Sequence, residues 1–92
     1  MANRRQIKKD INELLADVID ECYESLYRNK GQNEKEVEAI IDEVVEVADS
    51  LIGKINAAQK LTTRSEVKKC YAEVKEELSE MTISFIEKLN LL

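Results

Sequence analysis

The segment NEKEVEAIIDEVVEVADSLIGKINAAQK, residues 33–60, decides the fold of this chain. Its apolar residues recur every three or four positions, the period of a helix that buries one face. The stripe consists of Val37, Ile41, Val44, Ala48, Leu51, Ile55 and Ala58. Asn33 followed by Glu36 has the spacing of a capping box, in which a side-chain oxygen accepts a hydrogen bond from the first turn. We therefore predict a helix over residues 34–59.

Gly53 lies inside this predicted helix. Glycine costs a helix interior about 1 kcal/mol relative to alanine, so a break at this position is the alternative. The apolar stripe nevertheless continues beyond it through Ile55 and Ala58. We therefore expect one uninterrupted helix.

The preceding segment carries a similar stripe, made of Ile7, Ile11, Leu14, Leu15, Val18, Ile19, Cys22, Tyr23, Leu26 and Tyr27. This spacing predicts a helix over residues 4–29. Asn3 with Gln6 resembles a capping box, and Gly31 suits a left-handed helix end. The segments on the two sides of residues 30–33 should therefore be joined by a very short turn.

The final segment shows heptad spacing, with Val67, Tyr71, Val74, Leu78, Met81, Phe85 and Leu92 in the stripe and Leu89 beside it. Thr63 and Glu66 again have capping-box spacing. This predicts a helix over residues 63–91. Each of the three helices would be about 39 Å long at 1.5 Å per residue.

The composition and the short connections together indicate the architecture. The chain has 92 residues, no proline, two glycines and 36% charged residues. Short loops force consecutive helices to run antiparallel. We expect an all-α, up-down-up antiparallel three-helix bundle forming a single domain over residues 1–92. No apolar run approaches the roughly 20 residues that span a bilayer, and the start lacks a secretory-signal pattern, so we expect a cytoplasmic protein without a membrane span.

The residue types argue against catalysis. The chain has no histidine, which excludes Ser-His-Asp and Cys-His catalysis and most zinc sites. Ser65 and Lys68 match the Ser-x-x-Lys pattern of β-lactamase-like proteins, but the companion motifs are absent. Carboxylate pairs such as Asp17 with Glu21 lie one helical turn apart and are typical of a solvated face. We therefore expect no enzyme activity, no cofactor and no metal.

The two cysteines, Cys22 and Cys70, are expected to be free thiols. In the predicted bundle Cys22 would lie about 27 Å from the end where the chain starts, and Cys70 about 12 Å from it. A disulfide needs Cα atoms within about 7 Å, so we expect no disulfide between them within one chain. Cys22 belongs to the apolar stripe, so we expect it to be buried.

Basic residues are concentrated at one predicted end of this acidic protein. Residues 1–10 and 53–69 together sum to plus seven, although the net charge of the chain is minus five. This basic pole would comprise Arg4, Arg5, Lys8, Lys9, Lys54, Lys60, Arg64, Lys68 and Lys69. Such a pole could bind nucleic acid or another anion. The alternative is that these charges serve solubility and the helix dipole.

Apolar residues beyond the three stripes indicate a contact surface. Exposed apolar patches mark interfaces, and tyrosine is enriched in them. The predicted interface consists of Tyr23, Tyr27, Ile40, Val47, Ile83, Ile86 and Leu89. The alternative is a wide core that absorbs these residues. We expect self-association or a protein partner.

The opening MANRRQIKKDINELLADVIDECY, residues 1–23, resembles a group of small uncharacterised bacterial proteins. They begin Met-Ala-Asn, continue through basic residues to Lys-Lys-Asp-Ile-Asn, and carry a Glu-Cys pair about ten residues later. The resemblance implies an all-helical domain and assigns no functional residue.

The function that these observations favour is a non-enzymatic helical interaction module, acting as a homodimer that docks through apolar helix faces. The alternative is an anion- or nucleic-acid-binding regulator that uses the basic pole.

Overall fold

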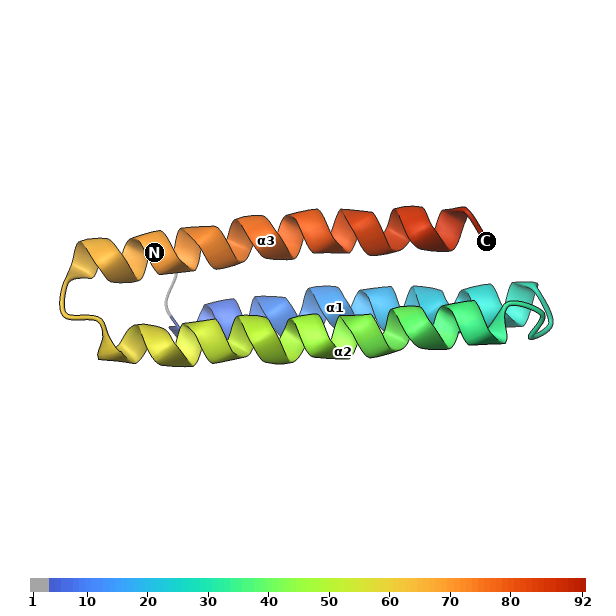
Figure 1. Ribbon diagram of the computed structural model, residues 1–92, viewed down its shortest axis with the longest axis horizontal. Coiled ribbons are helices and arrows are strands. Elements are labelled where there is room, and N and C mark those ends of the chain that lie inside the picture. Colours follow the sequence, from blue (N-terminus) through green and yellow to red (C-terminus); the bar gives the residue numbers. More distant parts are fainter. Residues whose placement is uncertain (1–3) are drawn as a thin grey trace.

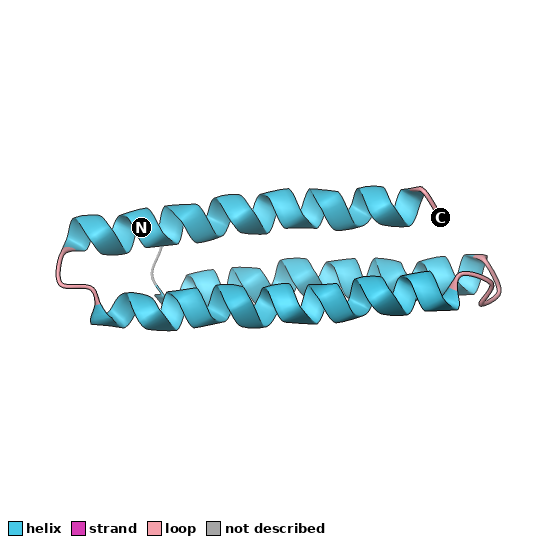
Figure 2. Ribbon diagram, viewed as in Figure 1, coloured by secondary structure: helices cyan, strands magenta, loops and turns pink. Residues whose placement is uncertain are grey.

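The computed structural model, which describes residues 4–92, confirms the all-α three-helix bundle (Figures 1 and 2). The helices are α1 (Arg4–Arg28), α2 (Glu34–Ala57) and α3 (Arg64–Asn90), with a short 3-10 helix η1 (Ala58–Lys60) after α2. α1 and α3 run in one direction and α2 runs in the other (Figure 1). The result is a rod measuring 51 × 18 × 17 Å.

The predicted helix bounds agree with the structure to within two residues. α2 ends at Ala57, where the backbone changes from an α-helix to the 3-10 helix η1. The residue after η1, Leu61, has an extended backbone. Gly53 lies inside α2, so the break considered at this position does not occur. The short connections produce the antiparallel order that the sequence predicted.

The turn between α1 and α2 differs in detail from the prediction. The first left-handed residue is Lys30, with φ 52°, and Gly31 follows with φ 78°. The Gly31 N–H donates to the Leu26 carbonyl at 3.0 Å, and the Lys30 N–H donates to the Tyr27 carbonyl at 3.3 Å. This is a Schellman end in which lysine occupies the position that usually favours glycine.

The predicted caps have three different outcomes. The Thr63 hydroxyl accepts from the Glu66 backbone N–H at 3.2 Å, which confirms the cap of α3. The Asn33 side chain makes no capping hydrogen bond; its amide instead donates to the Ser25 hydroxyl at 3.0 Å, and both side chains are buried. Asn33 is thus the N-cap residue of α2 as predicted, but the predicted side-chain cap is wrong: its Oδ1, the atom that would accept from the first turn, is buried without a hydrogen-bond partner. Asn3 lies outside the described residues.

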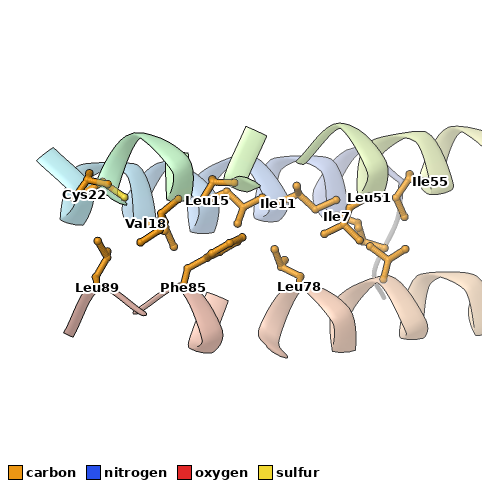
Figure 3. Packing of buried hydrophobic residues seen from close by; sticks show 14 residues of the cluster. Ile7, Ile11, Leu15, Val18, Cys22, Leu51, Ile55, Leu78, Phe85 and Leu89 are labelled. Carbon is orange, nitrogen blue, oxygen red and sulfur yellow. The ribbon is translucent and has the colours of Figure 1, made fainter. Parts of the chain in front are cut away.

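One apolar stripe from each helix forms the core (Figure 3). The side chains of Leu78, Phe85 and Leu89 on α3 point toward the α1–α2 pair. The largest side chains that are almost completely buried are Phe85, Ile7, Ile11, Leu15, Leu51 and Ile55. Burial on this scale is the main favourable contribution to folding.

The core includes more residues than the three apolar stripes predicted from the sequence. Ile40 and Leu89 are only 6% and 8% exposed, and Val47 and Ile86 are partly buried against the same cluster. These four residues were predicted to belong to an interface. They instead pack inside the bundle, because each of its helices buries flanking residues as well as its central stripe.

The two glycines should respond oppositely to substitution by alanine. Gly53→Ala should raise the free energy of unfolding by about 1 kcal/mol, because an added Cβ meets no atom within 4 Å and alanine favours the helix. Gly31→Ala should lower it by about 1 kcal/mol, because φ is 78° there. Urea unfolding followed by circular dichroism measures both. Changes of equal sign would contradict the structure of this turn or of α2.

Candidate interaction surfaces

A groove of about 500 Å³ runs between α1 and α3. Leu78 lies at its base and is almost completely buried. The remaining lining residues on α1 are Asp10, Glu13, Leu14 and Asp17. Those on α3 are Lys75, Ser79, Thr82 and Ile83. The two walls thus come from helices that run side by side in the same direction.

The groove combines exposed aliphatic side chains with charged groups. Leu14 is 40% exposed and Ile83 is 57% exposed, although both have large aliphatic side chains. The acidic groups all lie on the α1 side, whereas Lys75 lies on the α3 side. This combination suits an amphipathic helix that carries positive charge on one flank.

The seam between α2 and α3 is closed in a different way. The Lys54 ammonium lies 2.7 Å from the Glu77 carboxylate, and the Lys88 ammonium lies 2.9 Å from the Glu43 carboxylate. Lys88 also lies 5.7 Å from the centre of the Phe85 ring. Within residues 4–92, no ion pair joins α1 to α3. The α1–α3 groove therefore lacks the charged links that cover the opposite side of α3.

Most of the predicted interface residues lie outside the groove. Tyr23 and Tyr27 are 59% and 87% exposed, but neither lines the groove. Ile83 is the member of the predicted set that does. Leu14 was assigned to the core stripe, and its exposure was missed. Its position on the same side of α1 as Asp10 and Asp17 is the signal that could have identified it.

The basic pole is spread along the bundle. α1 begins part of the way along the rod, whereas the α2–α3 turn lies at its end (Figure 1). The start of α1, which carries Arg4, Arg5, Lys8 and Lys9, is therefore displaced along the rod from Lys60 and Arg64, which flank the turn, whereas Lys68 and Lys69 lie within α3. Lys54 donates a hydrogen bond to Glu77, and this contact raises the pKa of the lysine. Lys9 lies 3.8 Å from Glu13.

The two thiols are free and lie in different environments. Cys22 is completely buried, as predicted. Burial raises the pKa of its thiol, and the nearby Glu21 carboxylate adds to the shift. Cys70 is half-buried, with its sulfur 3.7 Å from the Lys54 carbonyl oxygen.

Over residues 4–92, no group of three or more His, Cys, Asp or Glu side chains is placed to hold a metal ion. In the same residues, no helix combines the length and the apolar character needed to cross a membrane.

We compared the chain with protein-family models, with curated proteins and with solved structures, and no match was found in any of the three. The resemblance of residues 1–23 to small bacterial helical proteins therefore stays a prediction.

The thiols provide a test of the core. At neutral pH a thiol reagent should label Cys70 readily and Cys22 about a hundredfold more slowly, because the thiolate is the reactive form and Cys22 is both buried and shifted to a higher pKa. Mass spectrometry after timed quenching measures the two rates, with Cys70→Ser as the control. Equal labelling rates in the folded protein would contradict the burial of Cys22.

Proposed function

We propose that this chain is a non-enzymatic helical interaction module that self-associates as a homodimer through the α1–α3 groove, in the cytoplasm. The observation that carries the proposal is the exposure of Leu14 and Ile83 within one groove. A fourth helix laid in such a groove would complete a four-helix arrangement and cover both side chains. The free thiols are typical of a reducing compartment.

The surface area of the chain leaves room for an association. The accessible surface is 6502 Å², and an interface of standard size buries roughly 800 Å² on each partner. A dimer in which two rods lie side by side would cover surface on this scale.

The non-enzymatic part of the proposal is supported by the side chains that the chain contains. Without histidine, no imidazole can accept or donate a proton near neutral pH. The groove combines carboxylates and one lysine with aliphatic and hydroxyl groups, and no cysteine lines it. These groups suit docking by apolar contact with charged edges.

Replacing both exposed aliphatic residues should weaken the dimer. Leu14→Glu combined with Ile83→Glu should raise the dissociation constant of the dimer at least about tenfold, because burying each aliphatic side chain contributes about 1.5–3 kcal/mol. Sedimentation equilibrium measures the constant. Val45→Glu is the matched control, since Val45 is 48% exposed but lies on α2.

The control variant should dimerise like the unmodified chain, and circular dichroism should show that all variants remain helical. A strict monomer at millimolar concentration would contradict the proposal. So would a double variant whose dimer is as strong as that of the unmodified chain.

A second candidate function is anion binding at the α2–α3 turn, in agreement with the alternative drawn from the sequence. Lys60, Arg64, Lys68 and Lys69 are all exposed within ten residues at the end of the rod, with Glu66 as the one acidic residue among them. The clustering of these charges favours attraction of a polyanion such as nucleic acid.

Retention on heparin and on double-stranded DNA tests this candidate. Binding at low salt should fall on raising the salt, and Lys68→Glu with Lys69→Glu should abolish it. Lys35→Glu on α2 is the control, because it makes the same kind of charge reversal, at one position, at the opposite end of α2. Absence of retention at low salt would contradict anion binding.

A further inference from the structure

The α1 side of the groove is acidic along its length. Asp10 and Asp17 line it, and Glu21 lies one turn after Asp17 on the same face of the helix. These carboxylates follow the basic start of α1, which carries Arg4 and Lys8. A helix that enters the groove therefore meets negative charge beside the second half of α1.

The α3 side of the groove has the opposite character in its first half. Lys75 lines the groove, and Lys68 and Arg64 lie seven and eleven residues earlier, which places them on the same helix face. The second half of this face is apolar, with Ile83 in the groove and Ile86 packed against the core. α3 thus carries the apolar side chains and the positive charges that suit docking in the groove.

The direction of an incoming α3 follows from these charges. Because α1 and α3 run in the same direction, a second α3 laid parallel to the first would place its basic half toward the basic start of α1 (Figure 1). Laid antiparallel, its Lys75 and Lys68 would approach the stretch that contains Asp17 and Glu21. Opposite charges then face each other across the interface, which fixes register and orientation.

Two antiparallel α3 helices would approach each other most closely at Ser79. It lines the groove near the middle of α3, and its small side chain allows two helix axes to approach within about 8–10 Å. A two-fold axis at Ser79 places each residue opposite the one equally far on the other side of it. Ile83 would then face the partner's Lys75. The aliphatic part of the lysine side chain accommodates an isoleucine.

We infer that the occupant of the α1–α3 groove is α3 of a second copy of this chain, antiparallel to the first α3 about a two-fold axis at Ser79. This inference rests on the proposed function and adds the docking element, its direction and its charge pairing. The partner's Lys75 and Lys68 pair with the carboxylates of Asp17 and Glu21. The arrangement is isologous, so both grooves are filled at once.

Cysteine crosslinking tests the position of the axis. Ser79→Cys in a Cys70→Ser background should form a disulfide-linked dimer on mild oxidation, because the two new thiols meet at the axis. Ser50→Cys on α2 is a matched control and should remain uncrosslinked. Ser65→Cys distinguishes the directions, since a parallel α3 pair would crosslink at both Ser65→Cys and Ser79→Cys.

A charge exchange tests the partner element. Lys68→Glu with Lys75→Glu makes one chain, and Asp17→Lys with Glu21→Lys makes the other. Each alone should dimerise at least about tenfold more weakly than the unmodified chain, because like charges then face each other. A mixture of the two should dimerise at near the original strength, because both interfaces again pair opposite charges.

These outcomes separate the inference from the proposed function. A dimer that requires Leu14 and Ile83 but neither crosslinks at Ser79→Cys nor recovers in the mixture would overturn the inference and leave the groove as the docking surface. Crosslinking at Ser65→Cys would overturn the antiparallel direction. A chain that remains monomeric at millimolar concentration would overturn the inference and the proposed self-association together.

Discussion

The packing of α3 against the α1–α2 pair is the contact on which the remaining structure depends. Phe85 and Leu78 bury their side chains against that pair, and no α3 stripe of this size could be left in water. The exposed ion pairs to α2 add little to stability, since pairs at the surface are screened by solvent. They do, however, lie on one side of α3 only. The other side, toward α1, remains open as a groove.

The sequence was sufficient to predict the three helices, because the apolar period and the short turns leave few alternatives. It was insufficient for details that depend on packing. Leu14 and Leu15 are adjacent and equally apolar, yet Leu15 is 2% exposed and Leu14 is 40% exposed. Neighbouring positions differ by about 100° around a helix, so a wide stripe does not reveal which leucine faces the core. The same ambiguity placed the buried Ile40 in the predicted interface.

The capping and turn residues in the sequence also did not predict all of the local structure. Asn33 has the correct residue type and spacing for a cap, but its amide bonds the buried Ser25 across the turn. Lys30 has a left-handed backbone that its residue type does not favour, because the Schellman hydrogen bonds hold it there. In both places, hydrogen bonds to residues outside the short motif determine the local structure. The groove likewise becomes visible only when α1 and α3 are placed side by side.

The charges along the α1–α3 groove favour one direction for a docked helix. Small-angle X-ray scattering combined with mass determination on the unmodified chain distinguishes the proposed dimer from a monomer and from an end-to-end dimer. Because the axis at Ser79 lies near the middle of α3, the proposed dimer should have twice the chain mass and a length close to the 51 Å of one chain. A monomer mass, or a doubled mass with a length near twice that of one rod, would contradict it.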